Sequence, residues 1–185
     1  MSVLTFATDS MIYRTMGLLQ NEIDLLDKDA PNYYINMGEA MGKYAIETSM
    51  VKVFGSDCSH WVIDQGLQIF GGYGFLEEYP LAPAYRDDRI NQIWEGTNEI
   101  NRQIITGFIM KKALTEELPY REAIRAIDSF LSQEPNKGDS LLAKECDTVE
   151  TAKKIGLYLF NEALSEFAQD LKNEHQIVEM LSDVF

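Results

Sequence analysis

A glutamate beside a glycine is the residue of this sequence best suited to acid–base chemistry. Glu95 stands in the run Trp94-Glu95-Gly96-Thr97, directly before a segment with helical periodicity. Gly96 carries no side chain, so a ligand can come close to the carboxylate. The apolar neighbours Ile93 and Trp94 disfavour its charged form, which makes it a usable base. Acids are also favoured at helix N-termini for electrostatic reasons alone, and composition by itself favours that simpler interpretation.

Two further motifs precede Glu95. The run RDDR at residues 86–89 places two acids between two arginines. It either holds its loop through structural ion pairs or contacts a phosphate, and the structural interpretation is favoured. The run GGYG at residues 71–74 resembles a phosphate-binding loop only loosely, because it follows a predicted helix rather than a strand.

Composition limits the partners and the compartment. The chain has 185 residues, 45% of them hydrophobic, and a net charge of −14. That length suffices for one core, or one core with a small appendage. The negative charge argues against nucleic acid or an anionic membrane surface as the main partner. The N-terminus lacks a secretory pattern, and no window reaches the length of a membrane span.

The two cysteines and two histidines of the chain show no spacing that indicates a metal site or a disulfide. Cys58 and Cys146 lie far apart, which favours two free thiols in a reducing, cytoplasmic compartment over a disulfide. His60 and His175 have no partners at metal-ligand spacing and are expected to be surface or half-buried helix residues. No metal site is predicted.

Helical periodicity covers most of the chain, and no segment alternates like a strand. Gly55 is expected to loosen the middle of the second helix, and Gly71-Gly72 to end it with a left-handed C-cap. Thr97 is the expected N-cap of the third helix. The first helix has no cap at its start, which is typical of a helix that extends further upstream. Helices are predicted over residues 2–27, 37–70, 97–114, 120–131, 148–173 and 176–185.

The intervening segments complete the prediction of an all-α, antiparallel helical bundle. Residues 28–36 are expected to form a turn around Pro31, and residues 133–140 to form a linker. The connection over residues 71–94 contains only a short helical turn, at 84–88. A connection of this length inside a compact chain is more often functional than accidental.

Three motifs together resemble one family. The run QIFGGYGF, the proline-containing connection and the run YRDDRINQIWEGTNEINRQI have the order and spacing of the C-terminal helical domain of the acyl-CoA dehydrogenases. The resemblance covers residues 2–114 and is specific, because all three motifs must coincide. It changes the favoured interpretation of Glu95 from a helix-end acid to a catalytic base.

The resemblance implies an FAD-dependent enzyme of fatty acid β-oxidation that converts an acyl-CoA to the trans-2-enoyl-CoA. Glu95 is implied to remove the proton α to the thioester carbonyl while a hydride leaves the β carbon for the flavin. An α-carbon acid needs a positioned base, and no side chain can accept the hydride, so both residue type and cofactor agree with this chemistry. Some branches of the family place the base on an earlier helix, and Glu95 matches the majority arrangement.

The resemblance also implies further site residues and partners. Gly96 is implied to lie at the substrate. Thr97 and Glu99 are implied to lie beside the FAD of their own subunit. The pyrophosphate of a neighbouring subunit's FAD is implied to meet Gln68, Ile69, Phe70, Gly71 and Gly72. The residues at 86–89 are implied mainly to hold their loop. Implied partners are an acyl-CoA substrate, an electron-transfer flavoprotein as acceptor, and further copies of the chain in a homodimer or homotetramer.

The chain departs from the family pattern at both ends. The family's N-terminal helical domain and middle β domain are absent from this sequence, so the chain is expected to be a C-terminal fragment that is inactive alone. Residues 115–185 extend beyond short family members and resemble the longer, very-long-chain-like ones. The expected domains are therefore a helical bundle at 1–114 and a helical extension at 115–185. The net charge favours oligomer contact over membrane proximity as the role of the extension.

A second function remains open. The chain could be a non-catalytic helical module that kept the family's sequence and serves oligomerisation or other interactions. The long extension favours this alternative slightly, whereas the intact Glu95 speaks against it. The reading frame upstream of codon 1 distinguishes them: a long in-phase frame supports the enzyme, and a stop codon supports the module.

Overall fold

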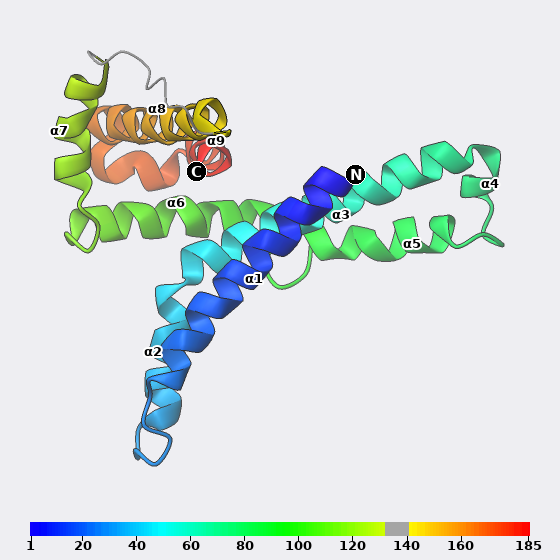
Figure 1. The fold of residues 1–185 in the computed structure, drawn as a ribbon, viewed down its shortest axis with the longest axis horizontal. Helices are drawn as coiled ribbons and strands as arrows, with labels where there is room; N and C mark the ends of the chain where they lie inside the picture. Colours follow the sequence, from blue (N-terminus) through cyan, green and yellow to red (C-terminus); the bar gives the residue numbers. More distant parts are fainter. Residues whose placement is uncertain (132–140) are drawn as a thin grey trace. The chain divides into compact units, whose positions relative to one another are not determined.

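The computed structural model describes residues 1–131 and 141–185, so the predicted linker at 133–140 lies outside the described residues. The described residues form helices and no strand, which confirms the all-α prediction (Figure 1). They divide into two compact units, Met1–Ile105 and Thr106–Phe185, with the boundary inside one helix. The expected division into domains at 1–114 and 115–185 stays a prediction.

In the first unit, α3 is the central helix. It packs against α1 on one side and against α5 on another, and α5 runs back beside it (Figure 1). The elements of this unit are α1 (Ser2–Asp24), α2 (Tyr33–Lys43), α3 (Ala45–Phe70), α4 (Gly72–Phe75), α5 (Leu81–Asp88), the 3-10 helix η1 (Arg89–Gln92) and the first part of α6 (Asn98–Leu114).

The predicted helix over 37–70 is two helices, and this is a correction. Tyr44 separates α2 from α3 with φ −99° and ψ 20°. The sequence does not indicate this break, because apolar periodicity continues through Tyr44 and Ala45. Gly55 does not loosen α3. A Cβ there would lie 3.5 Å from Thr8 Cγ2, an ordinary van der Waals contact, so the space at this position does not require glycine.

Two glycines shape the end of α3. Gly71 ends the helix as predicted, and its N–H donates to the Gln68 carbonyl at 3.1 Å. Its φ of 59° favours glycine, but its ψ of −138° lies outside the left-handed helical region that was expected. Gly74 is buried in α4, where a Cβ would lie 2.5 Å from the Leu67 carbonyl oxygen. Only glycine fits at that position.

The connection over 71–94 is more helical than predicted. It contains α4, all of α5 and η1, rather than one short turn at 84–88. Pro80 caps α5, and Pro83 sits in its first turn, where a missing N–H costs nothing. Proline had argued for a loop, yet both prolines occupy positions that begin a helix.

The second unit has its own apolar core. It contains the rest of α6, then α7 (Tyr120–Leu131), α8 (Ala143–Phe167), the 3-10 helix η2 (Ala168–Asn173) and α9 (His175–Val184). Phe160 is 1% exposed and makes edge-to-face contacts with Tyr120 and Phe185. The buried Thr106 hydroxyl donates to the Val178 carbonyl at 2.8 Å, joining α6 to α9. The remaining core side chains are Ala113, Leu171, Val178 and Leu181.

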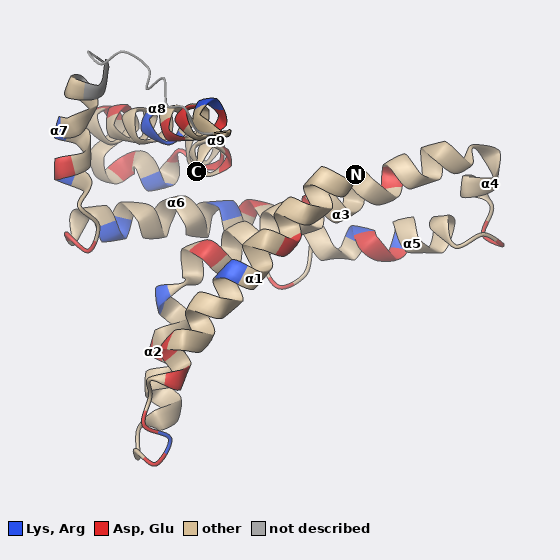
Figure 2. Cartoon of the chain, viewed as in Figure 1, with Lys and Arg blue, Asp and Glu red and all other residues tan. Residues whose placement is uncertain are grey.

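The surface of the described residues carries both acidic and large apolar side chains. Acidic side chains occur on helices of both units rather than on one element (Figure 2). Large apolar side chains remain exposed on the first unit, including Phe6 at 74%, Tyr13 at 78% and Phe75 at 80%. Contiguous exposed apolar surface marks a contact site in soluble proteins. The first unit therefore presents surface suited to further protein contacts.

The described residues also bear on membranes, metals and thiols. No described helix combines the length and apolar character of a membrane span. No group of three or more His, Cys, Asp or Glu among them could hold a metal ion. Cys58 is buried, Cys146 is exposed, and both are free cysteines.

Candidate functional site

The backbone has an unusual conformation at Glu95, before α6 begins. Glu95 has φ 53° and Gly96 has φ 83°, so two successive residues adopt positive φ. This conformation is easy for glycine, but it costs a residue with a Cβ about 1–2 kcal/mol. Glu95 is exposed, so the apolar surroundings expected for it are not supplied by the described residues. Non-glycine residues in this conformation concentrate at functional sites.

Thr97 caps α6, as predicted. Its Oγ1 accepts the N–H of Ile100 at 3.3 Å. The pKa of Glu99 lies below its ordinary value, because its carboxylate accepts hydrogen bonds first from the Glu99 backbone N–H and then from the Thr97 hydroxyl. Asn101, which is 6% exposed, donates through Nδ2 to the carbonyls of Gly96 at 2.8 Å and Thr97 at 3.1 Å. The carbonyls of the turn are thus tied to the helix that follows it.

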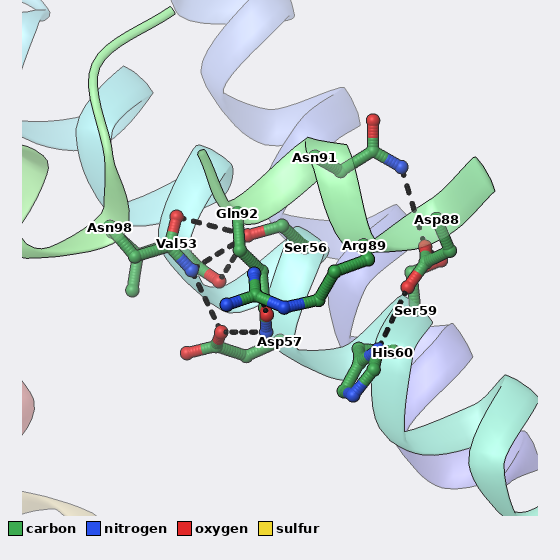
Figure 3. A network of polar contacts seen from close by, with 10 residues as sticks. All are labelled: Val53, Ser56, Asp57, Ser59, His60, Asp88, Arg89, Asn91, Gln92 and Asn98. Carbon is green, nitrogen blue, oxygen red and sulfur yellow. Dashed lines mark hydrogen bonds and ion pairs between the residues drawn. The ribbon is translucent and has the colours of Figure 1, made fainter. Parts of the chain in front are cut away.

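Asn98 joins the start of α6 to α3 (Figure 3). It is 3% exposed, and its Nδ2 donates to Ser56 Oγ at 2.9 Å and Asp57 Oδ1 at 2.7 Å. Its Oδ1 accepts from Lys52 Nζ at 2.6 Å. Buried amides of this kind are costly unless their partners are all in place. Asn98 lies three residues after Glu95. Its hydrogen bonds therefore attach the segment that carries Glu95 to the central helix α3.

Asp57 collects three donors from the segment around the turn. Gln92 Nε2 donates to its Oδ1 at 2.8 Å, from η1, in addition to the bond from Asn98 (Figure 3). Arg102 forms an ion pair with its Oδ2 at 3.1 Å, from α6. Residues on both sides of the Glu95 turn are thus bound to one carboxylate of α3.

Asp88 anchors α5 to α3, and this changes the interpretation of the RDDR run. Asp88 is 5% exposed and accepts hydrogen bonds from Ser59 and, at 3.3 Å, from Asn91. His60 Nδ1 lies 3.2 Å from its Oδ2 (Figure 3). Arg89 donates to Gln92 at 2.9 Å. Among the described residues the four members of the run form no ion pair with one another, so the structural role holds but the predicted ion-pair partners were wrong.

A pocket of about 260 Å³ lies beside the turn. Glu95 and Trp94 line it from the turn, and Lys52 lines it from α3. Burial lowers the pKa of Lys52, and the charges of Asp57, Glu99 and Glu95 partly offset that effect. The remaining lining residues are Val51, Gly55, Ser56, Ser59 and Asn91.

The predicted cofactor-binding residues form two separate clusters. Thr97 and Glu99 lie at the start of α6, beside the middle of α3. The other cluster ends α3 and is exposed throughout, namely Gln68, Ile69, Phe70, Gly71 and Gly72. At a rise of 1.5 Å per residue, about 20 Å of helix separates Asp57 from Phe70. The two clusters cannot hold the same phosphate group.

Sequence reasoning missed the residues that hold the turn, chiefly Lys52, Asp57, Asn98 and Asn101. Each lies on a predicted helix, and the sequence alone does not distinguish a polar residue that binds another segment from one that binds water. A usable signal was the polar band SDCSH at residues 56–60, which interrupts the apolar pattern of α3. A polar band on a helix with apolar flanks predicts partners from a neighbouring element.

Comparison with known proteins identifies the family. The profile of the acyl-CoA dehydrogenase C-terminal domain matches residues 11–110. The chain belongs to the acyl-CoA dehydrogenase family. A probable acyl-CoA dehydrogenase of Bacillus subtilis is 37% identical over 183 residues, covering 97% of this chain and 30% of that protein. A butyryl-CoA dehydrogenase of Syntrophomonas wolfei is 33% identical over 132 residues, covering 65% of this chain and 20% of that protein.

A solved structure extends the likeness to the whole chain. The crystal structure of an acyl-CoA dehydrogenase complexed with FAD from Bacillus anthracis matches with a TM-score of 0.92 and 37% identity. The match covers 98% of this chain and 31% of that protein. Both Bacillus proteins therefore match beyond residue 110, where the family profile ends. This acyl-CoA dehydrogenase chain spans about a third of the length of these two relatives.

Proposed function

We propose that this chain is the C-terminal helical part of an FAD-dependent acyl-CoA dehydrogenase, in which Glu95 is the catalytic base. The observation that carries the proposal is the Glu95 turn. A carboxylate is held at φ 53° beside a glycine and lines a pocket. The turn is tied to α3 through Asn98 and to α6 through Asn101. These anchors hold the carboxylate in one position beside the pocket, as a catalytic base requires.

In the proposed reaction Glu95 takes the proton α to the thioester carbonyl of an acyl-CoA. A Cβ at Gly96 would lie 3.1 Å from Asn101 Nδ2, so the glycine serves the close packing of the turn against α6 rather than open space for a ligand. The anchored turn fixes the direction from which the carboxylate approaches the substrate. When bound, FAD supplies the hydride acceptor that no side chain can provide, and the product is the trans-2-enoyl-CoA. The base must also be shielded from water, and this chain leaves Glu95 exposed. The chain alone is therefore expected to be inactive.

The residues at the end of α3 fit a cofactor phosphate. A Cβ at Gly71 or Gly72 would meet nothing within 4 Å, so the backbone there is open to a close approach. Gln68 adds an exposed amide donor, and Ile69 and Phe70 are exposed beside it. Thr97 and Glu99 form the second proposed FAD contact. Contacts of the two clusters with the FAD of two different subunits, and hence a homodimer or homotetramer, are proposed from the family resemblance.

Membership of the family also supports proposals for the electron acceptor, the pathway and the compartment. The expected electron acceptor is an electron-transfer flavoprotein, and the expected pathway is fatty acid β-oxidation in the cytoplasm. A nucleic acid or a membrane is not expected as a partner, because a net charge of −14 repels anionic surfaces. The exposed apolar residues of the first unit support burial against the remaining domains of a longer protein.

Glu95→Gln in the full-length enzyme tests the proposal. The amide keeps the size of the side chain but cannot take a proton at neutral pH. Turnover of acyl-CoA substrates should fall by about 10⁴-fold or more, whereas FAD content and acyl-CoA affinity should change little. A ladder of acyl-CoA lengths assayed with the unmodified enzyme would also define its chain-length preference. Near-normal turnover of Glu95→Gln would overturn the assignment of the base.

The second unit favours one alternative function. It has its own buried core around Phe160, so a helical oligomerisation module derived from this family is a second candidate. The reading frame upstream of codon 1 separates the two. A long frame in phase supports the enzyme, and an in-phase stop codon supports the module. A yellow, flavin-loaded preparation of the isolated chain would contradict the expectation that the chain alone binds FAD weakly or not at all.

A further inference from the structure

We propose that Lys52 is a positioning residue for Glu95, which it orients through Asn98 and faces with a positive charge across their shared pocket. This inference rests on the proposed function. Lys52 comes from the middle of α3, whereas Glu95 and Asn98 belong to the segment that begins α6. Its role is therefore to connect a fixed helix to the turn that carries the base.

The hydrogen bonds of Asn98 show why its Oδ1 needs a donor from Lys52. Ser56 Oγ accepts from Asn98 Nδ2 at 2.9 Å, and its single proton has two candidate acceptors. These are the Val53 carbonyl at 3.1 Å and Asn98 Oδ1 at 3.2 Å. Lys52 Nζ lies closer to Asn98 Oδ1, at 2.6 Å. Lys52 is thus the strongest donor to that oxygen.

Opposite charges fix which way the Asn98 amide faces. The Lys52 ammonium lies on its oxygen side and the Asp57 carboxylate lies on its nitrogen side, at 2.7 Å. A flipped amide would place NH₂ against the cation and oxygen against the anion. The pair Lys52–Asp57 therefore selects one orientation of Asn98, and with it one placement of the backbone that follows Glu95.

The charge of Lys52 also acts on the pocket. Lys52 and Glu95 both line it. The acids that face Lys52 are Asp57 from its own helix, Glu95 from the turn and Glu99 from α6. Arg102 neutralises Asp57 by an ion pair, and Arg89 acts on Glu99. Lys52 is therefore the cation that lines the pocket together with Glu95.

Three variants of Lys52 separate its two contributions. Lys52→Met removes both the donor and the charge, Lys52→Gln keeps a donor without the charge, and Lys52→Arg keeps both. The exposed Lys28 supplies a control, Lys28→Met, that changes the net charge equally. The first readout uses the 185-residue chain itself, through amide hydrogen exchange of residues 94–98.

In that chain, Lys52→Met should speed exchange in residues 94–98 by about tenfold, with little change in α8 and α9. Lys52→Gln and Lys52→Arg should stay close to the unmodified protein. Unchanged exchange in Lys52→Met would show that Lys52 does not hold the turn. Because this readout needs no activity, it judges the anchoring even if Glu95 proves not to be the base.

The second readout is the full-length enzyme. Lys52→Met should lower kcat by about tenfold or more while KM changes by less than about threefold. Lys52→Gln should lower kcat less than Lys52→Met does, because it keeps a donor for Asn98 Oδ1. Lys52→Arg, which keeps both the donor and the charge, should restore kcat. If Glu95→Gln is inactive but Lys52→Met keeps its kcat, the role of Lys52 is overturned. If Glu95→Gln stays active, the proposed function itself has failed.

Discussion

Asn98 Nδ2 donates to Asp57 Oδ1 at 2.7 Å, and this bond joins the first residue of α6 to the middle of α3. Gln92 and Arg102 contact the same carboxylate from either side of the Glu95 turn. The turn is thus held by a polar network that is buried at Asn98 and partly exposed at Asp57, rather than by apolar packing. A polar network of this kind specifies one geometry, because each unmade bond leaves a desolvated group.

The first prediction concerns that network. Asn98→Ala should lower the free energy of unfolding by about 1–3 kcal/mol, because it removes one hydrogen-bond partner each from Asp57, Ser56 and Lys52. The measurement is urea unfolding of the chain, followed by helical circular dichroism. Asn21→Ala, on the exposed face of α1, should change stability by no more than about 0.5 kcal/mol. Equal effects of the two substitutions would show that the network contributes no more than a surface amide.

The second prediction compares two glycines of one helical turn. Gly74→Ala should destabilise by about 1–3 kcal/mol, because its Cβ would lie 2.5 Å from the Leu67 carbonyl oxygen. Gly72→Ala should be close to neutral, since its Cβ would meet nothing within 4 Å. Thermal unfolding of both variants under identical conditions measures the difference. Matching melting temperatures would mean that α4 shifts without cost.

Much of the fold could be predicted from the sequence, because helical periodicity marks long amphipathic segments directly. The break at Tyr44 could not be seen, since apolar residues continue across it. The helix α5 was missed for a different reason. Pro80 and Pro83 indicated a loop, although the first turn of a helix tolerates proline.

The candidate site was predicted unevenly. Glu95, Gly96 and Thr97 could be found because they are neighbours in sequence with distinct chemistry. Lys52 and Asp57 could not, because nothing local tells a polar residue that binds a distant segment from one that binds water. Their role depends on α3 lying beside the start of α6, and only the fold places those segments together.

The third prediction concerns pH. Glu99 has a pKa below its ordinary value, because its carboxylate accepts hydrogen bonds from its own backbone N–H and from the Thr97 hydroxyl. A lowered pKa means that the ionised form is favoured in the folded state. Its contribution to stability is therefore fully present above the ordinary glutamate pKa and is lost as pH falls through the lowered value.

Glu99→Gln measures that contribution as a difference. Above pH 5 the unmodified chain should be more stable than the variant, and the two unfolding free energies should converge as pH falls below about 4. Glu122→Gln, at an exposed acid in the first turn of α7, controls for loss of charge at a helix start. A gap between Glu99→Gln and the unmodified chain that stays constant down to pH 3 would contradict the assignment.

The fourth prediction is that Glu95 is retained at a cost to stability. Its φ of 53° disfavours any residue with a Cβ. Glu95→Gly should therefore raise the free energy of unfolding by up to about 1 kcal/mol, after allowance for the added freedom of glycine in the unfolded chain. Glu95→Asn should also stabilise, because asparagine tolerates this conformation. Glu95→Gln keeps the Cβ and should leave stability unchanged.

Chemical denaturation of the three Glu95 variants tests this directly. The decisive comparison is between Glu95→Gly and Glu95→Gln, since both remove the charge and only one removes the Cβ. A gain confined to Glu95→Gly and Glu95→Asn would show that the backbone is strained at the residue proposed as the base. Proteins keep such strain where function requires the side chain. A loss of stability in Glu95→Gly would instead show that the turn is relaxed, and the strain would no longer support a catalytic role for Glu95.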